Sequence, residues 1–225
     1  MPSYLSLPGT SGNYASTPDS AALSIAGDLD LRIKAAMDDW TPAVGSVLFS
    51  KYTAASRDYL FQVNSSSGTV RFTRGDGAAT SVLSSSSASP TVADGASLWL
   101  RWTHRLSDQR VQFFTSVNGV DWSQLGTDRF ITPITPGDGT QGVEIGSNSG
   151  GTAGLWAGKV YTVEIRDGID GTVVASPDFT ALSPGETSFQ DAQGNTWTIN
   201  GTAAIVAQSL GGSDHVHRKL RLLTG

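Results

Sequence analysis

Hydrophobic and polar residues alternate along much of this chain. Residues 28–35, Asp-Leu-Asp-Leu-Arg-Ile-Lys-Ala, place Leu29, Leu31 and Ile33 on one face and charged residues on the other. A period of two is the pattern of an antiparallel β-strand with one buried face and one face in water. Similar alternation predicts further strands at residues 4–7, 47–52, 59–64, 70–74, 111–116, 142–146, 159–166, 173–175, 195–200 and 203–207.

Turn sequences separate the expected strands. Several hold an Asp-Gly or Asn-Gly pair, and glycine supplies the positive φ angles that reverse a chain. Such pairs stand at residues 76–77, 94–95, 118–119, 138–139, 167–168 and 170–171. Many short strands with turns at this spacing predict an all-β protein, an antiparallel two-sheet β-sandwich.

Two segments depart from strict alternation. Residues 97–103, Ser-Leu-Trp-Leu-Arg-Trp-Thr, are apolar on both faces, so we expect this strand in the middle of a sheet. The Ser-rich stretch 81–90 is expected to form a surface loop between two strands. Strand patterning continues on both sides of each segment, so neither marks a domain boundary.

The pattern ends near residue 206, which predicts one β-domain over residues 1–206. Residues 207–225 contain Gly-Gly-Ser and are expected to form a flexible hinge and a basic C-terminal arm. Because the charge of the arm opposes that of the domain, we expect it to dock on another protein subunit, with a solvated tail as the alternative. The residues that would dock are His215, His217, Arg218, Lys219 and Arg221.

Composition supports the β assignment and excludes several functions. The chain has 29 Ser, 23 Thr and 26 Gly but only 3 Glu and 4 Lys, so it lacks the residues that fill exposed helix faces. A net charge of −5 gives no basic surface for a phosphate backbone, so nucleic acid is not expected as a partner. With no cysteine there is neither a disulfide nor a thiolate metal site. No apolar run is long enough for membrane insertion, and the N-terminus does not resemble a signal peptide.

The order of several motifs is typical of one fold family. An aromatic-led strand at 4–9 leads into a Pro-Asp-Ser turn at 18–20, and the amphipathic strand that follows ends near a tryptophan. Residues 97–104 and 155–166 supply a Trp-containing strand and a closing Trp-Ala-Gly strand. Together these features resemble concanavalin A-like, laminin G-like domains. The resemblance implies that residues 1–206 form a jelly roll.

Three motifs point to a narrower group. They are Asn-Tyr-Ala-Ser-Thr-Pro-Asp-Ser at 13–20, Val-Asn-Gly-Val-Asp-Trp at 117–122 and Gly-Asn-Thr-Trp-Thr-Ile-Asn-Gly at 194–201. In combination they resemble minor tail and other virion surface proteins of bacteriophages that infect actinobacteria. The resemblance implies a structural protein of the virion, in the tail or decorating the particle surface, made in the host cytoplasm. Its partners would be other virion proteins, and such proteins are often homotrimers.

Catalytic residues are not evident. Glycosidases of the retaining type need two carboxyl groups about 5 Å apart, and related glucanases place them at alternating positions of one strand. The nearest candidate is Glu164, but its alternating neighbour is Arg166, and an ion pair explains these two residues better. His104 is the only histidine in the patterned region, and no Gly-x-Ser-x-Gly elbow is present. We therefore expect a protein that is not an enzyme.

Metal binding is not assigned. Domains of the resembled family often hold calcium on rim loops, through Asp side chains and backbone carbonyls. The chain has 17 Asp, several of them in turns, such as Asp138 and Asp170. Their spacing fits turn formation equally well, so calcium stays open and no cofactor is expected.

Glycan binding is the remaining route to a function. Sugar rings stack on exposed aromatic faces while Asp, Asn and Arg bind the hydroxyl groups. Residues of these types near strand ends and turns are the candidates, although tryptophans in a sandwich also serve as core residues. The candidates are Trp40, Trp99, Arg101, Asp121 and Trp122.

Three functions follow from these observations. The leading hypothesis is a non-enzymatic bacteriophage virion protein whose lectin-like domain could bind glycans of the host surface. The first alternative is a carbohydrate-binding module whose main role is glycan recognition. The second is a glycoside hydrolase, which the missing carboxylate pair disfavours.

Overall fold

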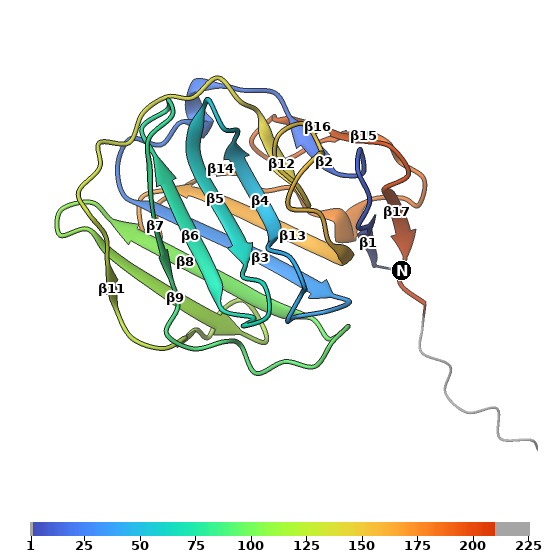
Figure 1. Ribbon diagram of the computed structural model, residues 1–225. Coiled ribbons are helices and arrows are strands. Elements are labelled where there is room, and N and C mark those ends of the chain that lie inside the picture. The colour runs from blue at the N-terminus through green and yellow to red at the C-terminus, as the bar shows by residue number, and fades with distance from the viewer. Residues whose placement is uncertain (1, 210–225) are drawn as a thin grey trace, which may run out of the picture.

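Two antiparallel β-sheets pack face to face in the computed structural model, which describes residues 2–209 (Figure 1). Sheet A has the strand order β10 (Ser123–Gln124), β9 (Arg110–Ser116), β8 (Leu98–Arg105), β3 (Leu29–Met37), β13 (Ala157–Asp167), β1 (Ser3–Pro8) and β17 (Ala204–Ala207). Two short strands extend it, β11 (Arg129–Phe130) beside β9 and β14 (Thr172–Ala175) beside β13.

Sheet B lies in front of sheet A in the view of Figure 1. Its strand order is β15 (Ser188–Gln190), β16 (Thr196–Ile199), β2 (Ala15–Thr17), β12 (Val143–Ile145), β4 (Ser46–Tyr52), β5 (Arg57–Val63), β6 (Val70–Gly75) and β7 (Ser81–Ser85). Short 3-10 helices occur at Ala21–Leu23 and Phe179–Ala181. Within residues 2–209 no helix is long and apolar enough to span a membrane. The all-β two-sheet sandwich predicted from the sequence is confirmed.

The core forms where the alternating apolar residues of the two sheets meet. Leu31 on β3 lies opposite Trp102 on one side and Ile165 on the other, and all three are fully buried. Trp102 also reaches across to sheet B, where the ring of Phe72 lies 4.3 Å from it between centroids. The strand that is apolar on both faces, β8, pairs with β3 and β9, so its predicted central place in a sheet is confirmed.

The Ser-rich stretch corrects one expectation. Residues 81–85 form strand β7 at the edge of sheet B, where Leu83 pairs with Thr73 of β6, so only the remainder of 81–90 is a loop. An edge strand needs one partner and leaves its outer backbone groups in water. Serine side chains are therefore tolerated at a position that sequence composition alone assigns to a loop.

A buried histidine in the core gives a first prediction. His104 is fully buried at the end of β8, where its Nε2 lies 3.3 Å from Gln109 Oε1. Burial, and then the positive charge of Arg74, lowers the pKa of His104 from 6.5 to about 4. The folded protein therefore binds fewer protons than the unfolded chain between these two pH values.

Stability is consequently expected to be complete above pH 6.5 and to fall as the pH drops towards 4. The part due to His104 is about 3 kcal/mol in the free energy of unfolding. Urea unfolding at several pH values between 4 and 7 measures it, with His104→Gln as the control in which this part of the slope disappears. Equal slopes in the two proteins would contradict the assignment.

Candidate functional site

Four of the five candidate glycan residues come together on the outer face of sheet A. Trp99 and Arg101 alternate on β8, and the turn after β9 brings Trp122 over them. The two tryptophan rings meet edge to face, 6.2 Å apart between centroids, and the Arg101 guanidinium carbon is 5.7 Å from the Trp122 centroid. Asp121, which is exposed, accepts a hydrogen bond from Asn118 in the same turn. Gly119 lets this turn approach, because a Cβ there would lie 2.7 Å from the Trp99 ring.

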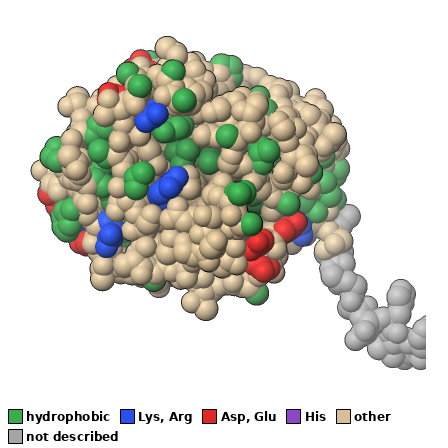
Figure 2. All heavy atoms as spheres, in the orientation of Figure 1, with side chains coloured by type: hydrophobic (Ala, Val, Ile, Leu, Met, Phe, Trp, Pro, Cys, Tyr) green, Lys and Arg blue, Asp and Glu red, His purple; other side chains and the backbone are tan. Residues whose placement is uncertain are grey.

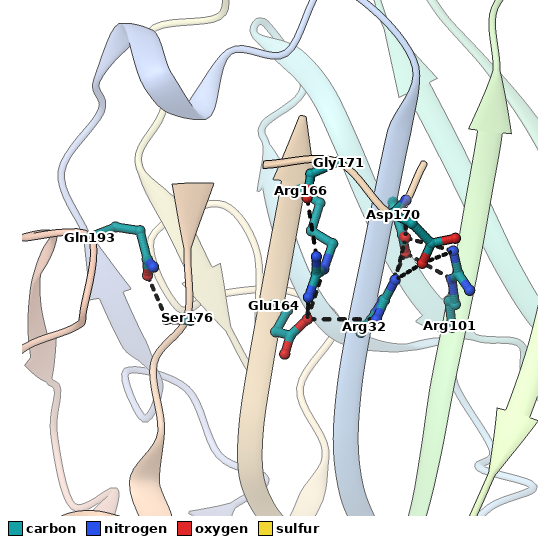
Figure 3. Close-up of polar contacts among 9 residues, drawn as sticks. Arg32, Arg101, Glu164, Arg166, Asp170, Gly171, Ser176 and Gln193 are labelled. Atoms are coloured by element: carbon teal, nitrogen blue, oxygen red, sulfur yellow. Dashed lines mark hydrogen bonds and ion pairs between the residues drawn. The ribbon is translucent and has the colours of Figure 1, made fainter. Parts of the chain in front are cut away.

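Trp122 lies over two arginines whose charges are balanced by aspartates. Figure 3 shows Arg32 and Arg101 meeting Asp170. Arg32 and Arg101 each place a terminal nitrogen 2.7 Å from an oxygen of Asp30, whose side chain is fully buried. The same two arginines also pair with Asp170, at 2.5 and 2.9 Å. Although partial burial opposes it, Arg101 and Arg32 hold the pKa of Asp170 below its usual range. The Asp170 carboxylate therefore stays ionised, which does not suit a general acid.

The predicted ion pair of Glu164 is confirmed. Arg166 lies 2.8 Å from the Glu164 carboxylate on β13, and Arg32 lies 3.8 Å from it (Figure 3). The Glu164 carboxylate is thus the ion-pair partner of two arginines.

Trp40 lies apart from these residues and is buried, with 4% of its surface exposed. Its backbone N–H donates to Asp94 Oδ1 and its ring Nε1 donates to Ala96 O. Neither face of the ring is open for stacking. Trp40 is therefore a core residue, which corrects its selection as a glycan candidate from its position after two aspartates at a strand end.

A second ionic cluster lies where β4 and β5 approach the segment around Gly139. Lys51 is fully buried, and its Nζ is 2.7 Å from Asp58 Oδ2 and 2.9 Å from Asp19 Oδ1. It also donates a hydrogen bond to Gly139 O. Burial raises the pKa of Asp58, against the opposing effect of Lys51. The Lys51 ammonium group thus fills the space between the two carboxylates. Asp58 is only 3% exposed, so a substrate could not reach its carboxylate.

Metal ligands do not gather in the part of the chain that the structure describes, where no group of three or more His, Cys, Asp or Glu could hold a metal ion. Of the two aspartates considered for calcium, Asp138 accepts a hydrogen bond from Ser24 and Asp170 pairs with two arginines. The predicted docking residues His215, His217, Arg218, Lys219 and Arg221 lie outside the described residues.

The outer face of sheet B contains a hollow of about 290 Å³ over β4–β7, which the sequence did not reveal. Its floor consists of two rows of residues that lie side by side on neighbouring strands. One row is Val47, Gln62 and Arg71, and the next is Leu60, Thr73 and Leu83. The walls are supplied by Gly45, Tyr52, Ser81, Asn148, Ala153 and Gly154.

A second hollow, of about 330 Å³, lies on the same face over β16, β2 and β12. It is lined by Tyr14, Ser16, Thr17, Pro18, Gly142, Glu144, Thr198 and Asn200. Glu144 accepts hydrogen bonds from Ser147 Oγ and from the backbone N–H groups of Gly150 and Gly151. The Glu144 carboxylate therefore fixes the loop whose next residues, from Asn148 to Gly154, border the first hollow.

These two hollows combine aromatic rings with hydroxyl and amide groups. Tyrosine faces, serine and threonine hydroxyls and asparagine and glutamine amides are the groups that bind sugars through stacking and hydrogen bonds. The face in view in Figure 2 is mostly uncharged, with Lys and Arg side chains spaced across it and Asp and Glu at its margins. The sequence did not reveal the first hollow, because Gln62, Arg71 and Thr73 alternate with apolar residues as any solvent-facing strand residues do.

The sequence matches no protein-family model and no curated protein. Solved structures do match. A candidate carbohydrate binding protein from Bacteroides ovatus aligns with a TM-score of 0.66 and 10% identity, over 94% of this chain and 61% of that one. The native heptameric SAP-like pentraxin from Limulus polyphemus aligns with a TM-score of 0.51 and 15% identity, over 74% of this chain and 76% of that one.

Domains LG4–5 of the mouse laminin alpha1 chain align with a TM-score of 0.48 and 14% identity, over 72% of this chain and 40% of theirs. At these identities the two alignments with TM-scores above 0.5 show a shared fold. The chain is therefore a two-sheet sandwich of the kind found in the Bacteroides and Limulus proteins, and it spans about three fifths of the Bacteroides protein.

Proposed function

We propose that this chain is a non-enzymatic glycan-binding domain whose binding surface is the outer face of sheet B. The observation that carries the proposal is the pair of hollows on that face, lined by aromatic rings and hydrogen-bonding groups. The shared fold with a candidate carbohydrate binding protein from Bacteroides ovatus supports it. The ion-paired state of Asp30, Asp170 and Glu164 supports a binding role rather than hydrolysis.

The test is a glycan array probed with three proteins of equal stability. They are the wild type, Tyr52→Ala in the first hollow, and Trp122→Ala on the opposite face. We expect binding by the wild type, a loss of about 10-fold or more in Tyr52→Ala, because stacking is lost, and unchanged binding in Trp122→Ala.

The opposite pattern, loss in Trp122→Ala alone, would move the site to the Trp99, Arg101 and Trp122 cluster on sheet A. That cluster is the second candidate surface, because it presents a tryptophan ring beside polar groups. A wild-type protein that binds no glycan above background would refute glycan binding.

The biological setting is proposed from the sequence resemblance. Under this proposal the chain is a structural protein of a bacteriophage virion, in the tail or on the particle surface, synthesised in the host cytoplasm. Its partners would be other virion proteins, including further copies in a homotrimer, and its glycan ligands would lie on the host surface. Immunogold labelling of purified particles tests this, and particles that never carry the label would refute it.

A further inference from the structure

The arginines of this chain differ in whether they have acidic partners. Four arginines in residues 2–209 form no ion pair with a carboxylate of that segment. One of them, Arg71, lines the hollow on β4–β7, and a second, Arg57, contacts Tyr52 and Ser81 in its wall. Ion pairs with carboxylates hold the five others, which are Arg32, Arg101, Arg105, Arg110 and Arg166. Two uncompensated cations at one hollow are notable in a chain of net charge −5.

Arg71 lies half-buried on the floor of the hollow. Its Nη2 donates to Gln62 Oε1 at 2.7 Å, while its buried Nε has no hydrogen-bond partner among the described residues. Asn148 Oδ1, in the wall, is likewise buried and unpartnered within residues 2–209. Burial lowers the pKa of Arg71, and the nearby Tyr52 opposes that effect. Partly burying a cation without a counter-ion costs free energy, and a bound anion would offset that cost.

A second positive charge, that of Arg57, lies at the edge of the hollow. The Arg57 guanidinium carbon lies 5.5 Å from the Tyr52 ring centroid, and Arg57 Nη1 donates to Ser81 Oγ at 3.3 Å. The described residues that line the hollow include no Asp or Glu. In Figure 2 the acidic side chains stand at the margins of this face. The local charge of the hollow is therefore opposite to that of the whole chain.

We propose that the hollow on β4–β7 binds a glycan that carries an anionic group, a carboxylate or a sulfate ester, with the Arg71 guanidinium as its counter-ion. The proposal rests on the glycan-binding function proposed above and names the chemical class of the ligand. A planar guanidinium presents parallel N–H donors that fit two oxygens of such a group. Tyr52, 5.5 Å from Arg57, supplies a ring for the sugar.

The experiment is calorimetric titration with three sets of oligosaccharides. One set contains galacturonic or glucuronic acid, one contains sulfated galactose, and one holds the carboxyl-reduced and desulfated counterparts of both. The proteins are the wild type, Arg71→Gln, Arg71→Lys and Arg129→Gln. Arg129 is an exposed residue of β11 on sheet A, so its variant has the same change of net charge at a different place.

We expect the wild type to bind one anionic set about 10- to 100-fold more tightly than its neutral counterpart. Arg71→Gln should lose this preference and keep the binding of neutral sugar, Arg71→Lys should keep part of it, and Arg129→Gln should resemble the wild type. Because Arg71→Gln removes an uncompensated charge, its melting temperature should not fall. The set that is preferred identifies the anion.

Equal affinity of the wild type for anionic and neutral sugars would overturn this inference and leave glycan binding standing. Equal losses in Arg71→Gln and Arg129→Gln would overturn the role of Arg71, because only net charge would then matter. Absence of binding to all three sets would overturn the inference, and a blank array for the wild type would separately overturn the proposed function.

Discussion

Replacing Lys51 by methionine is expected to lower the free energy of unfolding by about 3–5 kcal/mol. The Lys51 ammonium is fully buried and touches Asp58, Asp19 and the carbonyl of Gly139. Methionine fills a similar volume but leaves a buried aspartate without its cation. Asp58 bears most of this cost, because it is 3% exposed and its Oδ1 already lacks a partner among the described residues. Urea unfolding at pH 7 measures the loss.

A double-mutant cycle separates the lost ion pair from a simple packing defect. Adding Asp58→Asn to Lys51→Met removes the orphaned charge, so the double variant should recover part of the stability. Lys159→Met is the matched control, because Lys159 lies on the outside of β13 with its Nζ 5.0 Å from the Tyr4 ring centroid. A double variant as unstable as the additive sum would contradict the ionic explanation.

The second large effect is expected from Asp30→Asn, again about 3–5 kcal/mol. Asp30 is fully buried and accepts hydrogen bonds from Arg32 and Arg101 on its two oxygens. A neutral amide there leaves both guanidinium groups to Asp170, whose side chain is 67% exposed. Because Trp122 stacks on these guanidinium groups, its fluorescence should change together with stability.

Asp108→Asn is the control for this variant. Asp108 pairs with Arg105, but both side chains are about two fifths exposed, and exposed pairs contribute little. Its melting temperature should therefore match that of the wild type. If Asp30→Asn behaved in the same way, the buried network would have no structural importance.

The sequence predicted the fold well because strands leave a local signal. The alternation in residues 28–35 determined which face of β3 packs in the core, although the charged face expected in water is largely buried too. The double-sided apolar character of β8 determined its central place. The Trp99, Arg101 and Trp122 cluster was also within reach, since β9 follows β8 in a hairpin and the turn that carries Trp122 comes directly after β9. In each case the relevant residues are close in sequence or repeat with a period of two.

The ionic clusters and the hollows could not be predicted in this way. Asp170 and Asp30 are 140 residues apart, and Lys51 meets the carbonyl of a residue 88 positions later. One wall of the hollow around Arg71 is the loop that Glu144 holds through hydrogen bonds. That loop is more than 70 residues from Arg71 in the sequence. Whether an outward-facing polar residue lies on a flat surface or in a hollow is set by such distant contacts. Trp40 was misjudged for the same reason, because the residues that cover it come from around residue 95.

The pairing of β1 with β17 has a mechanical consequence. Ser3 lies opposite Ala207, so the two ends of the described chain leave the sandwich side by side (Figure 1). A force pulling these ends apart would load the hydrogen bonds between the two segments one at a time, starting where the Gln208 N–H donates to Pro2 O, and would peel β17 from the edge of sheet A. A load that enters through the face of sheet B and leaves through either end must instead pass through the packed core. The domain should thus yield easily between its own ends and resist when pulled from its hollowed face.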